Sequence, residues 1–377
     1  MTPFQLAHVP AINAGANALE QLTDLLSTES IQHILVVIDP GVQGAGLEPK
    51  ILAPIQSTQK AIIVSALPPG EPREAFIQET RAKVTDPLHT AVVCVGGGSA
   101  LDAGKLIANL LPSEKPVSDF RLANEPLPEN RPLLICVPTT SGTGSEATCV
   151  AVVAEDDGVK NWFWGPGLKP NHIVLDPTLT CGLPPFVTAI TGVDALVHAM
   201  EAATNKNAFS ANNLYCYEAI RLVSENLRTA IGEPDNLTAR GNMQLAATLA
   251  GIGIDNAGTA IAHNIAHALG SIAHIPHGLA VAMGMAATLE WNIEANPSAY
   301  KGVASAMGLN SVDELPKAFK TLVSDVKIDL TVSHEGLTNE TLAAVMQQPE
   351  NIAMANANLR TVEENDFFTI AQWVLDA

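Results

Sequence analysis

The sequence predicts an N-terminal α/β domain with a mostly parallel sheet, followed by an all-α C-terminal domain. In the first half of the chain, short β-branched runs alternate with amphipathic stretches, as strands and their covering helices do in an α/β fold. After Asp176-Pro177 this alternation ends, and Leu183-Pro184-Pro185 interrupts the chain. The length of 377 residues fits two domains, so we expect one over 1–184 and another over 185–377.

The elements follow from hydrophobic periodicity, taken in chain order. Strands are expected at Ile34–Ile38, Ala61–Ser65, Ala91–Val95, Leu133–Val137, Val150–Val153 and His172–Leu175. Helices are expected between them at Ala16–Leu26, Glu71–Val84 and Ala100–Leu110. The second domain is expected to contain helices at Val187–Ala203, Asn212–Ala230, Leu237–Ala257, Thr259–Ser271 and Gly278–Asn292, with shorter ones beyond.

Composition and charge exclude several classes of protein. Apolar residues make up 47% of the chain and charged residues 16%, which rules out a disordered or coiled-coil protein. The 20 Lys and Arg residues against 39 Asp and Glu give a net charge of −19, so nucleic acid and anionic membrane surfaces are not expected partners. The five cysteines include no C-x-x-C pair, and we expect a protein of the reducing cytoplasm.

Between Asp255 and Glu290 the chain carries no formal charge, a length that would suffice for a membrane span. The same stretch contains four histidines, Asn264 and Pro276, which are costly in hydrocarbon. We therefore expect a soluble protein in which this stretch is a buried, functional pair of helices.

Two loops rich in small residues follow predicted strands. Gly96-Gly97-Gly98-Ser99 opens a predicted helix, where backbone N–H groups can receive a phosphate, and the spacing of Ser99 and Asp102 is that of an N-cap pair. A strand-to-helix turn that binds nothing has the same pattern. The segment 138–146, which reads P-T-T-S-G-T-G-S-E, offers many donors at the same sheet edge, or is simply a flexible turn.

Asp39 closes the first predicted strand, where an acidic residue can accept hydrogen bonds from a ribose and disfavour a 2′-phosphate. In the usual fingerprint this residue follows the glycines, but here it precedes them. A capping role before Pro40-Gly41 is therefore an equal alternative.

A cluster of histidines gives the strongest functional signal. Four of the ten histidines fall between residues 263 and 277, at positions 263, 267, 274 and 277. Asp194 and His198 are four residues apart, so on a helix they share one face. Gly270 and Pro276 would allow the chain to reverse and present His277. One carboxylate and three imidazoles suit a divalent transition metal, iron or zinc.

Three further features are weaker signals. Lys105 is by default a solvated surface lysine, and Lys160, in the turn 158–160, either reaches a cofactor or is merely exposed. The run Trp162-Phe163-Trp164 lines a cleft or packs in a core, with the core favoured.

Taken together, these motifs resemble the iron-containing (group III) alcohol dehydrogenase family. The shared features are Asp39, G-G-G-S-x-x-D, P-T-T-S-G-T-G-S-E, D-P followed by L-P-P, T-G-V-D-A-L-V-H at 191–198, and H-x-x-x-H followed by P-H-G at 263–278. They occur in the family's order from residue 39 to 278, and because helical sequence continues to the end, the resemblance covers nearly the whole chain.

The resemblance implies an N-terminal dinucleotide-binding domain and a helical domain for the metal and substrate, with the active site between them. It implies these metal ligands: Asp194, His198, His263 and His277. It implies these cofactor contacts: Asp39, Gly97, Gly98, Ser99, Thr139, Thr140, Thr143 and Lys160. His267 would lie beside the nicotinamide as a proton-relay residue, and Asp39 suggests NAD(H) rather than NADP(H).

The expected reaction is reversible hydride transfer between NAD(H) and a small primary alcohol or its aldehyde, with Fe²⁺ as the metal and Zn²⁺ as an alternative. One alternative keeps the fold: an enzyme like glycerol dehydrogenase or dehydroquinate synthase, acting on a polyol or phosphorylated substrate. The other is a non-catalytic metal- or nucleotide-binding sensor. Few basic residues in the helical half disfavour a phosphorylated substrate, and the intact ligand set with His267 disfavours a sensor. The resemblance also suggests a homodimer.

Overall fold

The computed structural model describes residues 3–128, 130–156 and 158–376, which form two compact units. The α/β unit comprises His8–Thr140 and Gly144–Gly182. The helical unit comprises Leu183–Ala377 together with Met1–Ala7 and the three residues Ser141–Thr143. The tip of the second small-residue loop therefore packs with the helical unit, although it precedes the predicted boundary at residue 184.

The α/β unit is built on a six-stranded sheet in the order β1-β8-β5-β4-β2-β3, in which every neighbouring pair is parallel. Its strands are β1 (Ala11–Ala14), β2 (His33–Ile38), β3 (Ala61–Ala66), β4 (Thr90–Gly96), β5 (Leu134–Pro138) and β8 (His172–Leu175). The predicted parallel sheet is confirmed, and five of the predicted strands lie in it. The edge strand β1 was not predicted.

The predicted strand at Val150–Val153 forms, but not in this sheet. As β6 (Val150–Ala154), it pairs antiparallel with β7 (Lys160–Trp164), which contains the aromatic run. Phe163 is buried in the apolar core, whereas Trp164 is exposed. Core packing therefore accounts for Phe163.

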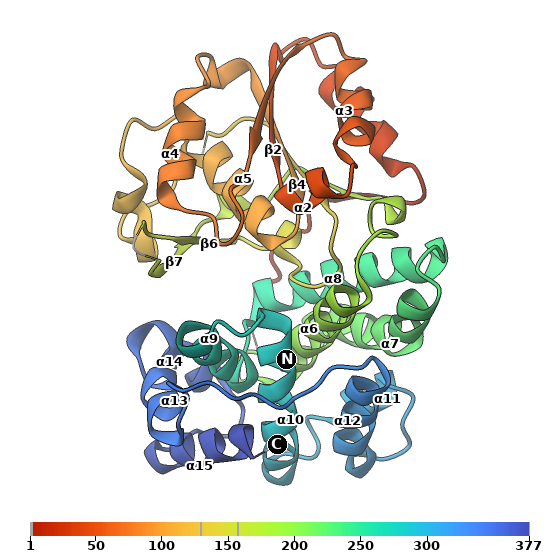
Figure 1. The fold of residues 1–377 in the computed structure, drawn as a ribbon, viewed down its shortest axis with the longest axis vertical. Helices are drawn as coiled ribbons and strands as arrows, with labels where there is room; N and C mark the ends of the chain where they lie inside the picture. Colours follow the sequence, from red (N-terminus) through yellow and green to blue (C-terminus); the bar gives the residue numbers. More distant parts are fainter. Residues whose placement is uncertain (1–2, 129, 157, 377) are drawn as a thin grey trace. The chain divides into compact units, whose positions relative to one another are not determined.

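Helices cover both faces of the sheet because successive strand residues point to opposite sides and both sides are apolar. Leu35, Val37 and Val92 pack beneath α4 (Glu74–Ala82) and α5 (Gly98–Leu110). Ile34, Val36 and Val93 pack on the other face with α1 (Leu22–Leu26) and α3 (Glu48–Gln56). Figure 1 shows α4 and α5 on one side of the strands and α3 on the other.

Short helical turns complete this unit. The predicted helix Ala16–Leu26 divides into a 3₁₀ turn, η1 (Ala18–Gln21), and α1, after Asn17 in the left-handed conformation. The remaining short elements are α2 (Pro40–Gly44), η2 (Pro87–His89), η3 (Val117–Ala123), η4 (Ser145–Ala147), η5 (Pro166–Leu168) and η6 (Pro177–Leu179).

The helical unit has one large apolar core. Its first five helices are α6 (Pro185–Thr204), α7 (Ser210–Gly232), α8 (Leu237–Ala257), α9 (Ile261–Ala273) and α10 (His277–Ala295), and their ends lie within three residues of those predicted. The rest are α11 (Lys301–Ala306), η7 (Val312–Glu314), α12 (Leu315–Asp325), α13 (Asn339–Met346), α14 (Pro349–Ala357) and α15 (Glu364–Leu375).

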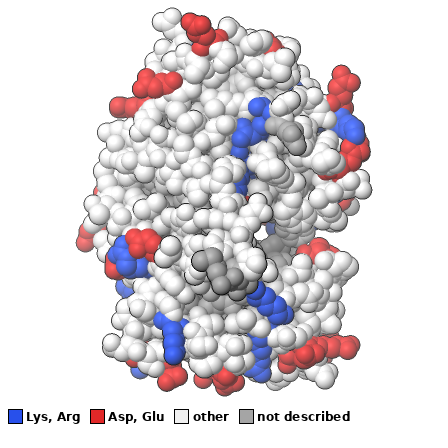
Figure 2. Space-filling model, turned by 180° about the vertical axis from the view of Figure 1, so that it is seen from behind, with Lys and Arg blue, Asp and Glu red and all other residues white. Residues whose placement is uncertain are grey.

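α6 has the length and apolar composition of a membrane-spanning helix. So do α8 and α9 when they are taken together as one span bent by 102°. Most of α6 is buried against its neighbours in the core of the helical unit. A core helix of a globular domain has these properties as well. On the face shown in Figure 2, Lys and Arg side chains lie in small separate groups on a mostly uncharged surface.

Candidate metal centre and cofactor site

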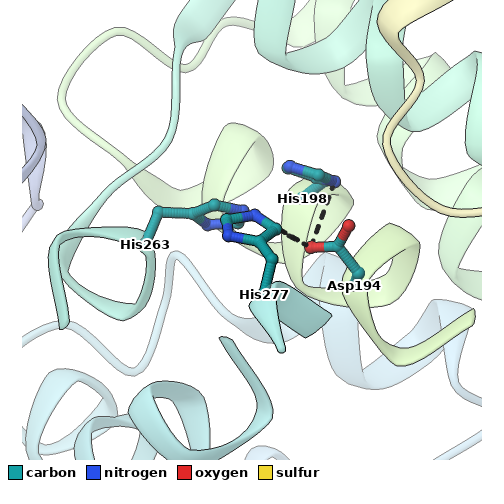
Figure 3. A group of neighbouring side chains, drawn as sticks. All are labelled: Asp194, His198, His263 and His277. Atoms are coloured by element: carbon teal, nitrogen blue, oxygen red, sulfur yellow. Dashed lines mark ion pairs between the residues drawn. The ribbon is translucent and has the colours of Figure 1, made fainter. Parts of the chain in front are cut away.

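Asp194, His198, His263 and His277 converge on one point in the helical unit, as Figure 3 shows. The nearest ring nitrogens of the three histidines each lie 3.7 Å from Asp194 Oδ1. Each residue offers one ligand atom, and these atoms all lie within 4.8 Å of one another. Residues from distant parts of the chain therefore lie close enough together to bind one metal ion.

Three helices supply these side chains. α6 provides Asp194 and His198 on one face because the two residues are four apart. α9 provides His263 in its first turn, and His277 is the first residue of α10. A Cβ on Gly278 would lie 2.3 Å from the Ile190 carbonyl oxygen, so only glycine lets the start of α10 approach α6 this closely.

The reversal between α9 and α10 differs from the expectation. His274 ends α9 in the left-handed conformation, with φ of 52°, and Pro276 is the N-cap of α10. Gly270 lies inside α9, and its carbonyl accepts the His274 N–H at 3.1 Å. Gly270 was expected to allow the reversal, but His274 adopts the positive φ instead. The sequence did not indicate this because histidine seldom adopts a positive φ.

The environment of the four residues fits a metal ion. Asp194 Oδ1, His198 Nδ1 and His263 Nε2 are buried and have no hydrogen-bond partner among the described residues. Buried polar atoms without partners are costly, and a cation would satisfy all three at once. The side chain of His277, by contrast, is 44% exposed, so the cluster faces solvent on the His277 side.

The electrostatics favour the ligand forms of Asp194 and His198. Burial alone would raise the pKa of Asp194, but the neighbouring histidines outweigh it and hold this pKa below its usual range. Burial lowers the pKa of His198 to about 3, so this ring is neutral at pH 7 and keeps a lone pair for an ion. For His263 burial also lowers the pKa, but the carboxylates of Glu201 and Asp194 raise it to about 9.

His267 is partly exposed on α9, one turn after His263. Its ring meets the His277 ring edge-on, with the ring centroids 5.6 Å apart. The structure therefore brings the predicted relay residue to the open side of the cluster.

In the α/β unit, the carboxyl ends of three adjacent strands gather several of the predicted cofactor contacts. The Asp39 N–H donates to the Val95 carbonyl across β2 and β4, which explains how Asp39 lies beside the glycines although it precedes them. The Thr139 N–H donates to the Gly96 carbonyl, and Thr140 follows it. The Asp39 carboxylate also caps α2, accepting from the Gly41 N–H at 2.7 Å.

The glycine-rich turn starts α5 with Gly97 as N-cap, so Gly98 and Ser99 lie in the first helical turn with its unpaired N–H groups. The expected capping pair of Ser99 and Asp102 does not form. Asp102 instead accepts hydrogen bonds from the Ser145 hydroxyl and, at 2.9 Å, from the Val152 N–H.

Lys105 was expected at the surface, but its side chain is fully buried. Its ammonium donates to the Ser145 carbonyl at 2.8 Å and to the Thr148 hydroxyl at 3.1 Å, and it lies near Asp102. The expected exposure of Lys105 was wrong because the loop that contains Ser145 and Thr148 folds over α5.

The remaining two predicted contacts lie elsewhere. Thr143 groups with the helical unit, and Lys160 stands at the start of β7, where its ammonium lies 2.8 Å from a Glu71 carboxylate oxygen. Their contact with a cofactor stays a prediction.

Comparison with known proteins identifies the family of this chain. The family described as iron-containing alcohol dehydrogenase matches residues 10–177, and the C-terminal part of the Fe-containing alcohol dehydrogenase family matches residues 188–374. The chain belongs to the iron-containing alcohol dehydrogenase family.

Two relatives and one solved structure illustrate the likeness. "Probable alcohol dehydrogenase EutG" of Salmonella typhimurium is 34% identical over 75% of this chain and 72% of its own length. "Long-chain-alcohol dehydrogenase 1" of Geobacillus thermodenitrificans is 31% identical over 97% of this chain and 98% of its own. The crystal structure of sulfoacetaldehyde reductase from Bifidobacterium kashiwanohense in complex with NAD⁺ has a TM-score of 0.89 at 25% identity and covers 100% of both chains.

Membership confirms the predicted reaction class, an alcohol dehydrogenase among the oxidoreductases. NAD and iron are the cofactors of this family, and one carboxylate with three imidazoles is a donor set that suits a divalent transition metal such as iron.

Sequence reasoning missed one residue of this centre, Glu201. It lies on α6 with Asp194 and His198 and is buried against His263. A signal was available, because a carboxylate seven residues after Asp194 falls on the same face of an otherwise apolar helix.

Proposed function

We propose that Asp194, His198, His263 and His277 hold a divalent metal at the active site of an NAD(H)-dependent dehydrogenase for small primary alcohols and their aldehydes. The observation that carries this proposal is the convergence of three buried, unpartnered ligand atoms, with a fourth residue on the solvent side. Iron is the first candidate because of the family, and zinc suits the same donor set.

When bound, the ion would supply Lewis acidity toward the substrate oxygen, and NAD(H) would accept or donate the hydride. The protein's own side chains exclude water and exchange the proton. Burial of Asp194, His198 and His263 keeps water from three sides of the centre, so substrate approaches on the side of His277. His267, partly exposed beside His277, would exchange the hydroxyl proton with solvent.

For the cofactor, we propose that Gly97, Gly98 and Ser99 bind the pyrophosphate at the start of α5, where the unpaired N–H groups attract anions. Asp39 would hold the ribose and select NAD(H). The position of Thr139 and Thr140 next to the glycines supports a role for both along the cofactor. Thr143 and Lys160 are proposed contacts on the strength of the family motif alone.

We further propose that residues 1–184 carry the NAD site and residues 185–377 the metal and substrate site. A homodimer is proposed from the family resemblance. We propose the cytoplasm as the compartment because the five cysteines include no C-x-x-C pair.

The test is a set of turnover assays on the purified protein. Protein loaded anaerobically with Fe²⁺, or with Zn²⁺, is mixed with NADH and acetaldehyde, propanal or butanal, and the NADH absorbance is followed. We expect metal-dependent loss of NADH that a chelator abolishes and added metal restores. Absence of turnover with every aldehyde, in protein that retains metal and binds NADH, would contradict the proposal.

A further inference from the structure

Glu201 is a buried carboxylate whose partners connect two parts of the metal centre. It follows His198 by less than one turn on α6 and is only 4% exposed. Its Oε1 accepts the Ala262 N–H at 2.7 Å, and its Oε2 accepts the Ala260 N–H at 2.8 Å. Oε2 also lies 2.6 Å from His263 Nδ1. Three donors thus converge on one carboxylate.

Two of these donors belong to the start of α9. Ala260 is the N-cap of this helix, and it has no side-chain oxygen that could satisfy the first N–H groups. Glu201 supplies that cap from the neighbouring helix, and its negative charge lies at the positive end of the α9 dipole. The carboxylate therefore fixes where α9 begins and, with it, the position of His263.

The third donor determines which nitrogen of His263 is available to an ion. His263 Nε2 faces Asp194 Oδ1, at 3.7 Å. Since Nδ1 lies at hydrogen-bond distance from a carboxylate, which only accepts, Nδ1 carries a proton, and in the neutral ring that binds an ion the lone pair is on Nε2. The ring is thereby fixed in both orientation and tautomer.

We propose that Glu201 is a positioning residue of the metal centre, which holds His263 in the ligand tautomer and anchors the start of α9 against α6. The inference rests on the proposed metal-binding role of Asp194, His198, His263 and His277. A carboxylate behind a metal-bound histidine commonly has this function. His198 differs, because its ring bonds to the backbone of Gly142, a neutral partner.

Glu201→Gln separates these roles from packing, because glutamine has nearly the same shape. Its single amide oxygen cannot occupy both acceptor positions, so in either orientation the NH₂ group faces a donor, either His263 Nδ1 and the Ala260 N–H or the Ala262 N–H. We expect the affinity for Zn²⁺ and Co²⁺, measured against a competing chelator, to fall about 10- to 100-fold. The visible absorption of the Co²⁺ form should change as well, since the His263 ring loses its fixed orientation.

The matched control is Thr204→Val, one turn further along α6. It removes a buried hydroxyl that donates to the Met200 carbonyl at 2.8 Å and also bonds Tyr300, and neither partner is one of the four proposed ligands. This variant should lose stability yet bind Co²⁺ as the parent does, with the same spectrum. Equal losses of metal affinity in both variants would reduce Glu201 to a structural residue and overturn the inference.

Two further measurements cover the case in which Glu201→Gln does not fold. Glu201→Asp keeps the charge but shortens the reach by one methylene group, and we expect it to bind Co²⁺ more weakly than the parent. In parent protein loaded with Zn²⁺ and labelled with ¹⁵N at histidine, the N–H assigned to His263 Nδ1 should be protected from exchange with water, in addition to any N–H of the buried His198 ring. Unchanged Co²⁺ affinity in Glu201→Asp, or absence of a protected proton at His263 Nδ1, would contradict the role of Glu201. Failure of the parent to bind metal would instead contradict the proposed function.

Discussion

His277, the first residue of α10, places its Nε2 3.7 Å from Oδ1 of Asp194, in the middle of α6. The same oxygen lies 3.7 Å from ring nitrogens of His198 and His263. Asp194 therefore faces all three histidines and supplies the negative charge among the four. Its loss should damage the centre more than the loss of the exposed His277.

We expect Asp194→Ala to abolish metal retention, with an affinity for Zn²⁺ at least about 100-fold below that of the parent, because outer-shell changes alone already cost up to that factor. The α/β unit does not include Asp194, so the variant should still bind NADH. Metal content after desalting and NADH fluorescence measure the two properties.

The control for this change is Asp313→Ala, an exposed acidic residue of the same unit. It should retain metal fully. If Asp194→Ala lost NADH binding together with the metal, the proposal that one half of the chain binds NADH and the other binds the metal would be wrong.

Gly142→Ala should disturb the centre from the loop side. A Cβ at this position would lie 2.7 Å from Thr191 Cβ and 2.9 Å from the Thr191 backbone, and Gly142 also bonds the His198 ring. The loop tip must move, so we expect a loss of about 1–3 kcal/mol in the free energy of unfolding and weaker metal binding. Gly232→Ala, with nothing within 4 Å of its added Cβ, serves as the control and should change neither urea midpoint nor metal affinity.

Much of this architecture could be predicted because its signals are local. The strands have β-branched runs, and α8 has the predicted bounds of Leu237–Ala257 because a long apolar period ends at Gly258. Asp194 and His198 could be paired since their spacing alone puts them on one face. The predictions that were wrong concern features set by tertiary contacts. Lys105 is buried because a loop covers it, and β6 lies outside the main sheet because it pairs with β7. The spacing of Glu201 from Asp194 places it on the same helix face, but that spacing does not tell which donors will face the carboxylate, and so its role was missed.

Asp39→Asn should relax the preference for NADH. The side chain caps α2 through the Gly41 N–H, and asparagine preserves this hydrogen bond while removing the charge that would repel a 2′-phosphate. We expect the ratio of kcat/KM for NADH to that for NADPH to fall about 10- to 100-fold, equivalent to about 1.4–2.8 kcal/mol. Asp86→Asn, an exposed change before η2, should leave the ratio as it is. An unchanged ratio in Asp39→Asn would remove Asp39 from the cofactor site.

Lys105→Met should destabilise the α/β unit strongly. The ammonium is fully buried and donates to the Ser145 carbonyl, the Ser145 hydroxyl and the Thr148 hydroxyl, so its removal leaves these acceptors and Asp102 without a cation. Breaking a buried charged contact costs about 3–5 kcal/mol, which urea unfolding would detect. Lys115→Met, which removes an exposed ion pair with Glu125, should change the free energy of unfolding by less than about 1 kcal/mol. Similar small effects in both variants would show that the buried hydrogen bonds of Lys105 contribute little to the free energy of unfolding.

Tyr300→Phe should alter the stability of the protein at alkaline pH. Burial raises the pKa of Tyr300 to about 12 from the ordinary value of 10.0, so the folded protein keeps a proton that the unfolded chain releases. The resulting stability is complete below pH 10 and is lost as the pH rises toward 12. Phenylalanine cannot titrate, and it also loses the hydrogen bond to Thr204. The variant should therefore be less stable than the parent at pH 8, yet its urea midpoint should fall less steeply above pH 10. Parallel slopes for the two proteins would mean that Tyr300 does not contribute to alkaline unfolding.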